Sequence, residues 1–501
     1  MTEKLYHFIG GKRVDGTSGR FGDVFNPATG EVQAQVPLAN ASDVDQAVQS
    51  AVAAFDVWSK MSAPRRSQVM FKFRELLIGS MDELADIVGK EHGKTIADAK
   101  GSIQRGVDVT EFACGIPHLF KGEFSSNVGG GIDTFSQREP IGVVGGITPF
   151  NFPVMVPLWM GVMAIACGNS YINKPSERDP SAAMYLGELW KKAGLPDGVW
   201  NVVNGDKEAV DALLQHPDVP AISFVGSTLV GEYIYHEGTK QNKRVQVFGG
   251  AKNHMIIMPD ADMDQAVDAL VGSAYGSAGQ RCMAISVAVP VGEGTADALV
   301  AKLAPRVQAL RYGPWNDPEA DMGPVITAQA KERIEDYIAQ GVKAGAELVV
   351  DGRGASLQGY EGGNFCGGSL FDHATTDMSI YQDEIFGPVL TTVRANDFDQ
   401  AVKMVNDHEF GNGVAIFTRD GDAARTFANQ VDVGMIGINV PIPVPLAFHN
   451  FGGSKRSKFG DTQMHGPESV RFFTKMKTIS ARWPASGIRE GALFSMPTAG
   501  H

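Results

Sequence analysis

IGVVGGITPFNFPVMVPLWMGVMAIACGNSYINKPSE, residues 141–177, is the stretch of the chain that decides the fold. Its first seven residues, 141–147, and its segment 169–175 contain short apolar runs that are typical of buried strands. Between them, FPVMVPLWMGVMAIACG at 152–168 is apolar and contains helix formers. This order predicts a strand, a loop, a buried helix and a second strand, and therefore a βαβ unit with parallel strands.

The apolar run can also be read as a membrane helix, because nothing between Glu139 and Lys174 is charged. A helix that spans a bilayer needs about 20 apolar residues. This run is shorter, contains two prolines and is flanked by Asn151 and Asn169. We therefore expect a buried helix, and no membrane as a partner.

The alternation of strand-like runs with helical patterns continues after this unit. Short apolar strands separated by helices predict a parallel sheet with helices on both faces. A second series starts near residue 250, so the expected fold class is α/β, with a Rossmann-type parallel-sheet domain followed by a second α/β domain. The expected strands are GVWNVVNG (198–205), AISFVG (221–226), HMIIMPD (254–260) and ISVAVPVG (285–292), and the expected helices lie near 179–193, near 207–215, after Ser227 and near 263–276.

The N-terminal part of the chain is helical in pattern. Residues 42–58 place apolar side chains on one helical face, and Ser42 with Asp45 forms a capping pair in front of it. Further helical patterns cover about 64–92 and 93–119.

Two polar segments interrupt this pattern. Residues 120–140 are rich in Gly and Ser and poor in helix formers, which favours an extended arm. The region after about 450 is rich in Gly, Ser, Lys and Arg and ends in the strand-like VRFFTKMKTIS at 470–480. The expected division is 1–119 with 141–249 as one domain, 250–450 as the second, 120–140 with 451–485 as the arm, and 486–501 as a C-terminal tail.

The bulk composition excludes several classes of function. A net charge of −13 disfavours nucleic acid and anionic membranes as partners, and it means that an anionic substrate needs local cations. The four cysteines are far apart and form no C-x-x-C pair, so we expect no disulfide framework and no metal site. The N-terminus, MTEKLYHFIGGKRVDG, lacks the core of a signal peptide, which leads us to expect a cytoplasmic location.

Cys282 is the strongest candidate nucleophile. It lies in AYGSAGQRCMAIS (274–286), in a loop of small residues between a helical pattern and a strand. A thiolate is a strong nucleophile near neutral pH, and a neighbouring cation such as Arg281 lowers the pKa of a thiol. A lone cysteine is more often a small buried residue, so the surrounding sequence must decide.

The surrounding sequence resembles that of the aldehyde dehydrogenase family. The active-site string GQRC (279–282) is accompanied, in the family's order, by TPFNFP (148–153), NKPSE (173–177), FVGSTLVG (224–231), GGAKNH (249–254) and EIFGPV (384–389). The resemblance covers essentially residues 5–480. It implies oxidation of an aldehyde on Cys282, with Asn151 and the Cys282 N–H as donors to the developing oxyanion. The alternative for Asn151 is a turn residue.

Several of these strings have the chemistry of a dinucleotide site. Lys174 and Glu177 follow a strand, where ribose hydroxyls bind in open α/β sheets, and Glu177 would repel a 2′-phosphate, which favours NAD over NADP. Ser227 opens a helix and suits a pyrophosphate, although no G-x-G-x-x-G is present. The alternative for Lys174 and Glu177 is a surface ion pair. Further cofactor contacts that the resemblance implies are Glu384 on the nicotinamide ribose, Phe386 beside the nicotinamide, backbone contacts from Thr148 and Phe150, the Gly249 carbonyl near the carboxamide, and Arg178 beside the adenosine.

One position departs from the hydrolytic members of the family. These usually carry a general-base glutamate two residues before the second glycine of GGAK, and here that position is Phe248 in VFGGAK (247–252). A phenyl ring cannot accept a proton. A thiol such as coenzyme A needs little help from a base, because its pKa of about 8.5 already gives some thiolate. We therefore expect coenzyme A as the acyl acceptor.

The lack of this glutamate is shared with the methylmalonate-semialdehyde dehydrogenase branch, which usually has a smaller residue there. VPIPVP (440–445) and RGVDVTEFACG (105–115) also resemble that branch. The resemblance implies oxidation of methylmalonate or malonate semialdehyde to propionyl-CoA or acetyl-CoA with loss of CO2. It assigns the substrate carboxylate to Arg105 and Arg281. The alternatives are a solvated helical residue for Arg105 and a loop salt bridge for Arg281.

The resemblance further implies a homotetramer, a dimer of dimers, joined through the arm segments. It leaves open which semialdehyde is preferred and whether valine, inositol or β-alanine metabolism is served. Rival functions are a non-acylating aldehyde dehydrogenase that releases a free acid, a non-redox thiol esterase, and a catalytically inactive binding protein.

Overall fold

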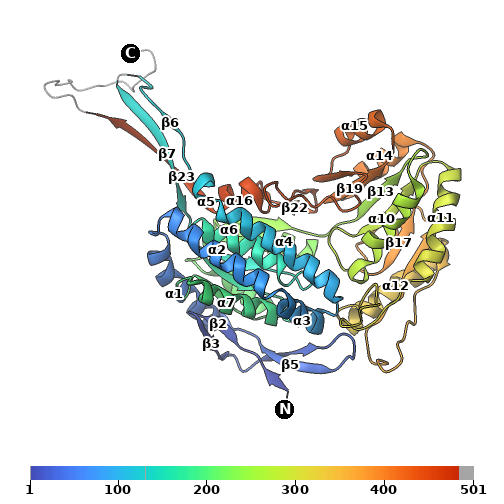
Figure 1. Ribbon diagram of the computed structural model, residues 1–501, viewed down its shortest axis with the longest axis horizontal. Helices are drawn as coiled ribbons and strands as arrows, with labels where there is room; N and C mark the ends of the chain where they lie inside the picture. The colour runs from blue at the N-terminus through green and yellow to red at the C-terminus, as the bar shows by residue number, and fades with distance from the viewer. Residues whose placement is uncertain (1, 130, 484–501) are drawn as a thin grey trace.

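The computed structural model describes residues 2–129 and 131–483, which form two α/β domains side by side and an arm that projects from the first (Figure 1). The sheet of the first domain has parallel central strands, because β12, β11, β8, β9 and β10 all run the same way, and antiparallel strands close both edges. In spatial order its strands are β22 (Lys458–Phe459), β12 (Arg244–Phe248), β11 (Ala221–Val225), β8 (Val143–Ile147), β9 (Ser170–Lys174), β10 (Trp200–Val202), β2 (His7–Ile9) and β3 (Lys12–Val14).

Helices cover both faces of this sheet, as expected from its buried strands. Side chains alternate along each strand, so Val144 and Tyr171 belong to one core cluster while Val143 and Ile172 belong to another. The helices of this domain are α1 (Ala41–Trp58), α2 (Ala63–Gly79), α3 (Met81–His92), α4 (Ile96–Cys114), α5 (Ile116–Leu119), α6 (Met155–Ala166), α7 (Ser181–Ala193), α8 (Lys207–Gln215), α9 (Thr228–Lys240) and α16 (Gly466–Phe472).

The apolar run 152–168 contains α6, in which every residue is buried. It packs against α4 and the sheet, so its apolar side chains are buried inside the protein and are not exposed to lipid or water. No helix within the described ranges is long and apolar enough to cross a membrane.

The second domain has its own sheet, in which only β15 runs antiparallel to its neighbour. Its strands are β15 (Glu347–Val350), β16 (Ser369–Asp372), β17 (Val389–Thr392), β14 (Ile285–Pro290), β13 (Asn253–Ile257), β19 (Gly413–Phe417) and β20 (Met435–Ile438). The helices around it are α10 (Met263–Tyr275), a 3-10 turn η1 (Gly276–Gly279), α11 (Glu293–Gln308), α12 (Ala328–Ala344), α13 (Ser379–Gln382), α14 (Phe398–Asp407) and α15 (Gly421–Gln430).

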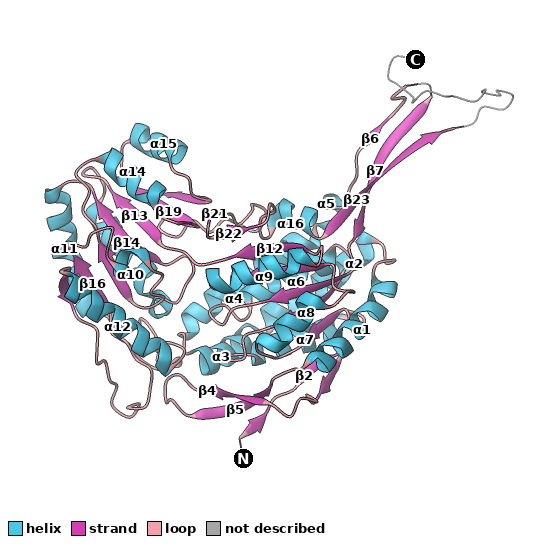
Figure 2. Cartoon of the chain, turned by 180° about the vertical axis from the view of Figure 1, so that it is seen from behind, coloured by secondary structure: helices cyan, strands magenta, loops and turns pink. Residues whose placement is uncertain are grey.

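The arm consists of β6 (Phe124–Ser125), β7 (Ile132–Pro140) and β23 (Thr474–Arg482), which stand out from the body in Figure 2. Thus the strands of segment 120–140 form one sheet with β23. Residues 451–473, expected in the arm, lie elsewhere, because β21 (Ser454–Lys455) pairs with β18 (Phe410–Gly411) and β22 pairs with β12. The tail 486–501 lies outside the described residues.

Smaller differences from the sequence expectations occur at the ends of elements. Helix α1 begins after Asn40, whose side chain and that of Asp43 form the capping box, so the expected pair Ser42 and Asp45 is wrong by two residues. The strand-like run 470–480 begins inside α16 before it becomes β23. The N-terminal strands β1 (Glu3–Lys4), β4 (Phe21–Phe25) and β5 (Val32–Pro37) were not expected from the sequence.

Candidate active site

The site lies where the carboxyl ends of the first sheet face the second domain. Strand register places these ends side by side, because Ile147 pairs with both Phe224 and Lys174, and Val225 pairs with Phe248. The residues that follow β8, β9, β11 and β12 therefore emerge at one edge, which is the usual position of nucleotide sites in open α/β sheets.

The loop that carries Cys282 has an unusual backbone. Ser277 (φ 54°), Ala278 (φ 51°) and Gly279 (φ 70°) follow one another in the left-handed region, which is costly for the two residues that have a β-carbon. Gly279 also packs so tightly that a β-carbon there would overlap the carbonyl oxygen of Gly387, in the EIFGPV segment. The backbone of the Cys282 loop and the backbone of the EIFGPV segment are thus in close contact at Gly279 and Gly387.

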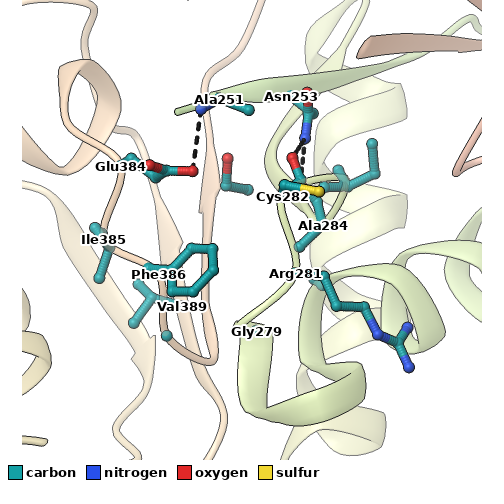
Figure 3. Close-up of a pocket in the computed structure, with 14 residues that line it drawn as sticks. Ala251, Asn253, Gly279, Arg281, Cys282, Ala284, Glu384, Ile385, Phe386 and Val389 are labelled. Carbon is teal, nitrogen blue, oxygen red and sulfur yellow. Dashed lines mark hydrogen bonds between the residues drawn. The ribbon is translucent and has the colours of Figure 1, made fainter. Parts of the chain in front are cut away.

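Two amides fix the main chain of Cys282. Asn253 Nδ2 donates to the Cys282 carbonyl oxygen at 2.9 Å, and Asn412 Nδ2 donates to the same oxygen at 3.1 Å. Figure 3 shows the first of these bonds, with Cys282 among the residues that line the pocket. Neither amide was identified from the sequence, because the two residues are far from Cys282 along the chain. The only available signal was the Asn of GGAKNH.

On one side of Cys282 lies an aromatic pocket that contains Asn151 and Phe248. The Asn151 side chain is buried, and among the described residues no hydrogen-bond partner occupies its amide. Phe248 ends β12 and packs edge-to-face on Phe451, with ring centroids 5.7 Å apart. Apart from Cys282, no titratable side chain within the described ranges lines this pocket, which is completed by Phe152, Val156, Trp159, Val225, Gly249, Asn412 and Met464.

On the other side of Cys282 lie Glu384 and Phe386, both from the EIFGPV segment (Figure 3). Glu384 Oε1 accepts from the Ala251 N–H at 3.0 Å. Burial raises the pKa of Glu384 to about 7, against the opposing effects of that hydrogen bond and of Lys252. The ring of Phe386 meets that of Phe150 edge-on, with centroids 5.9 Å apart.

Burial also dominates the acidity of the nucleophile. Burial first, and then the Glu384 carboxylate, raise the pKa of the Cys282 thiol to about 12, while the backbone N–H groups of Cys282 and Met283 and the Lys94 ammonium act in the opposite direction. A thiol of this pKa is protonated at neutral pH. The surroundings of Cys282 therefore keep the thiol in its protonated, less nucleophilic form. A positive charge nearby lowers its pKa and so increases its reactivity.

The candidate cofactor residues collect at the sheet edge. Lys174 is buried and donates to the Gly205 carbonyl oxygen at 2.9 Å, and its Nζ also forms an ion pair at 3.7 Å with the partly exposed Glu177, so the ion pair of the alternative interpretation is present. Thr148 is also buried, and its hydroxyl donates to Asn173 Oδ1. The exposed Arg178 guanidinium lies 5.7 Å from the Phe150 ring centroid.

Ser227 is exposed at the N-terminus of α9, and its side chain makes no capping bond. The first amides of the helix are thus open to an anion. Its neighbour Thr228 holds the edge of the cleft, because its Oγ1 accepts from the Gly250 N–H at 2.9 Å. Gly249 is fixed from the other side through its N–H, which donates to the Ser457 carbonyl oxygen at 2.8 Å. Thr228 was not singled out in the sequence, although it stands in the same FVGSTLVG string.

The two candidate arginines differ in their availability. Arg281 forms a 2.6 Å salt bridge with Asp98 of α4, and Figure 3 shows its side chain extending away from Cys282. The alternative of a salt bridge is therefore the arrangement found, and a substrate carboxylate has to compete with Asp98 for this guanidinium. Arg105 is not a solvated helical residue either, because its Nη2 donates to the carbonyl oxygens of Val444 and Pro445.

The family model of the aldehyde dehydrogenases, described as "Aldehyde dehydrogenase family", matches residues 14–479. The chain belongs to the aldehyde dehydrogenase family. The expected fold class is accordingly confirmed.

Several aldehyde dehydrogenases are similar over the whole chain. A malonate-semialdehyde dehydrogenase of Pseudomonas aeruginosa is 56% identical, with 99% of each chain covered. An acylating, mitochondrial methylmalonate-semialdehyde dehydrogenase of Arabidopsis thaliana is 47% identical and covers 100% of this chain, which spans 82% of the plant protein. A crystal structure from Sinorhizobium meliloti in complex with NAD, provisionally named methylmalonate-semialdehyde dehydrogenase, is 59% identical with a TM-score of 0.96 and coverage of 97% of this chain and 99% of that one.

Proposed function

We propose that the protein is an NAD-dependent, CoA-acylating dehydrogenase of malonate or methylmalonate semialdehyde that works through a thioester on Cys282. The observation that carries the proposal is Phe248 at the position of the usual general base. Its ring lines the pocket of Cys282, and none of the other described residues of that pocket can take a proton from water. The names of the similar proteins from Pseudomonas and Arabidopsis support the same substrate class.

The residues at the sheet edge fit NAD. An open helix N-terminus at Ser227 suits a pyrophosphate, and the partly exposed carboxylate of Glu177 suits ribose hydroxyls and disfavours a 2′-phosphate. Glu384 and Phe386 approach from the facing domain, where they are suited to the nicotinamide ribose and ring. When bound, NAD supplies the hydride acceptor of the oxidation. The NAD complex of the Sinorhizobium protein supports this choice.

The chain's own residues provide the rest of the chemistry. The Cys282 thiol releases its proton to solvent as its sulfur attacks the aldehyde carbon. After that carbon has lost its hydride to the bound cofactor, Cys282 carries the acyl group as a thioester. The free amide of Asn151 and the Cys282 N–H donate to the oxygen that becomes negative. The thioester carbonyl of a β-carboxyl acyl group is an electron sink, so its carboxylate can leave as CO2. Coenzyme A, a thiol that ionises without a strong base, then accepts the acyl group.

Arg105 is the better placed of the two arginines for the substrate carboxylate. It stands on α4, which packs against α6 in the wall of the aromatic pocket; two main-chain carbonyls hold its Nη2, and the carboxylate of Asp108 lies 3.7 Å from its Nη1, farther away than Asp98 is from Arg281. Arg281 has a buried carboxylate as its partner. We therefore assign the first contact with the substrate carboxylate to Arg105 and a second to Arg281 after exchange with Asp98.

The arm supports a homotetramer built as a dimer of dimers. Phe124 (65% exposed) and Met476 (48% exposed) present apolar surface on a projecting sheet, which is the kind of surface that pairs with another chain.

The first experiment follows NADH from the purified protein with NAD and malonate semialdehyde, with and without coenzyme A. Sustained turnover only with coenzyme A, and a burst of about one NADH per site without it, is the expected result, because hydrolysis of the thioester lacks its base. Equal steady rates in both would overturn the acylating assignment and direct attention to Glu384 as a base. Absence of NADH in both would overturn the redox assignment.

The substrate class is tested with Arg105→Leu. It should raise the KM for malonate semialdehyde at least about 10-fold, because one charge-assisted bond is lost, and leave the KM for uncharged propanal nearly unchanged. Arg74→Leu is the matched control, since Arg74 has the same side-chain exposure of 27% and pairs with Glu111 of α4 away from the pocket. Equal effects on both aldehydes would contradict recognition of a carboxylate by Arg105.

A further inference from the structure

Lys94 is a buried lysine that the proposed chemistry does not yet use. Gly93 ends α3 with a φ of 92°, and Thr95 begins α4 by accepting a hydrogen bond from the Asp98 N–H. A β-carbon on Gly93 would lie 2.8 Å from Pro324 Cγ, so this turn is pressed against the second domain. The tight turn directs the Lys94 side chain inward, where the residue is 1% exposed.

The ammonium of Lys94 contacts the oxyanion string. Its Nζ donates to the Asn151 carbonyl oxygen at 2.7 Å and lies 4.4 Å from the centroid of the Phe152 ring. The hydrogen bond thus holds the carbonyl group of Asn151, and the ring contact holds the side chain of the residue that follows it. A charge-assisted bond to a buried carbonyl is among the stronger hydrogen bonds of a protein, so it can fix the direction of the free amide.

The charges around Lys94 keep it protonated near neutral pH. Burial lowers the pKa of Lys94 to about 8, Arg281 lowers it too, and Asp98, Asp179 and Cys282 oppose this. The imidazole of His92 beside it is buried with no partner for either nitrogen among the described residues, and burial with the charge of Lys94 holds the pKa of His92 well below its usual value. Asn151, whose carbonyl oxygen binds the ammonium, lines the same pocket as Cys282. The Lys94 charge therefore acts on the nucleophile from the wall of that pocket, where it lowers the pKa of the thiol while the Glu384 carboxylate raises it.

We propose that Lys94 is a positioning residue of the active site: its ammonium fixes the main chain of Asn151, so that the free amide meets the substrate oxygen, and its charge favours the thiolate of Cys282. The proposal rests on the role of Cys282 as nucleophile. It adds a residue from the turn between α3 and α4, which lies far from the recognised strings along the sequence.

Another lysine of the chain provides a matched control. Lys243 is also buried, and its Nζ donates to the carbonyl oxygens of His216 and Val219 at 2.5 and 2.6 Å. Burial lowers the pKa of Lys243 to about 8 as well. Lys94→Met and Lys243→Met thus remove the same kind of carbonyl-holding ammonium, one beside Asn151 and one remote from the site.

The first readout is alkylation of Cys282 by iodoacetamide at pH 7, followed by mass spectrometry of the modified peptide. The other three cysteines are buried, so the rate reports on Cys282. Lys94→Met should lower the rate roughly tenfold, which corresponds to one pKa unit of the thiol. Lys243→Met should leave the rate unchanged. An unchanged rate in Lys94→Met overturns the electrostatic part of the proposal, even if the semialdehyde assignment itself proves wrong.

The second readout is the rate of the NADH burst in a double-mutant cycle with Asn151→Ala. Alone, Asn151→Ala and Lys94→Met should each slow the burst about 10²-fold, the effect of losing one oxyanion donor. Together they should slow the burst only about tenfold more than Asn151→Ala alone, which is the part that comes from the thiolate, because the positioning part acts through Asn151. Additive losses would overturn the positioning role. If the wild-type protein gives no burst, the proposed function fails together with the positioning role, and the alkylation rates still decide the electrostatic part of the proposal.

Lys94→Arg covers the case in which Lys94→Met does not fold, since the positive charge next to Asp98 is kept. It should retain the alkylation rate of the wild type while it slows the burst, because a guanidinium holds the Asn151 carbonyl in a different position. Loss of the alkylation rate in folded Lys94→Arg would overturn the proposal.

Discussion

At the residue scale, the site shows how burial and neighbouring charges set the chemistry of single side chains. Cys282 and Glu384 lie on two sides of the reacting region, and burial favours the protonated form of both. Phe248 replaces an acid with a ring that packs on Phe451. The same pocket can therefore hold an acyl enzyme away from activated water, which suits transfer to a thiol.

Phe248→Glu should give the enzyme a route to hydrolysis. A carboxylate at the end of β12 faces the Cys282 pocket and can activate water, so steady NADH formation without coenzyme A should rise at least about 10²-fold. Phe248→Gln is the matched control, because it has nearly the same shape as glutamate and accepts no proton. A rise of equal size in both variants would mean that opening the pocket, rather than a base, limits hydrolysis.

The pKa of Glu384, raised to about 7, predicts a pH dependence of NAD binding. Above pH 7 the carboxylate is ionised and accepts ribose hydroxyls more strongly, so the Kd for NAD should fall several-fold between pH 6 and 8. The same pKa shift has the opposite effect on the stability of the fold. The protonated Glu384 carboxyl contributes stability that is fully present below pH 4.5, the pKa of this group in the unfolded chain, and that is lost as the pH rises through 7. Titration calorimetry of Glu384→Gln should show no such slope in Kd. A slope that persists would assign the titration to another group, with Lys252, whose pKa burial lowers to about 7, as the first candidate.

At the scale of elements, the nucleophile is presented by a strained loop between α10 and β14. Ser277, Ala278 and Gly279 bring the chain out of the helix in left-handed conformations, and the Gly279 backbone touches the EIFGPV segment of the same domain. The amides of Asn253 and Asn412 then fix the Cys282 carbonyl from β13 and from the residue before β19. The position of the sulfur thus depends on contacts from three parts of one sheet.

Gly279→Ala should destabilise this loop by more than the cost of its positive φ alone. The positive φ costs about 1 kcal/mol, and the overlap with the Gly387 carbonyl forces the two segments apart. We expect a lower Tm and a loss of more than about 10-fold in kcat, since small displacements of a nucleophile are costly. Gly272→Ala, in α10 where a β-carbon meets nothing within 4 Å, is the control and should stay active. Retention of full activity in Gly279→Ala would show that the loop can move without loss of function.

At the scale of the whole molecule, the cleft between two sheets is the functional unit. One domain supplies the helix N-terminus and the oxyanion string, and the other supplies Cys282 and Glu384. The arm projects away from this cleft, and none of the candidate site residues lies on it (Figure 1).

Phe124→Glu together with Met476→Glu should lower the mass measured by light scattering from that of the proposed tetramer, because charges replace apolar surface of the arm, where we propose that the chains meet. Leu229→Glu is the control, since Leu229 is 75% exposed on α9, far from the arm along the chain. An unchanged mass with the arm variant would contradict assembly through this sheet.

The sequence by itself determined the class of the fold, the family and the candidate residues. Strands of a buried parallel sheet are continuous apolar runs, and catalytic strings such as GQRC and TPFNFP are local, so both can be read along the chain. Only the tertiary structure decided which of these residues meet. The pairing of Arg281 with Asp98, the amides of Asn253 and Asn412 on Cys282, and the contact of Lys94 with Asn151 join residues 29 to 183 positions apart. Such contacts arise from the packing of one sheet edge against another domain, and no local periodicity or spacing carries that information.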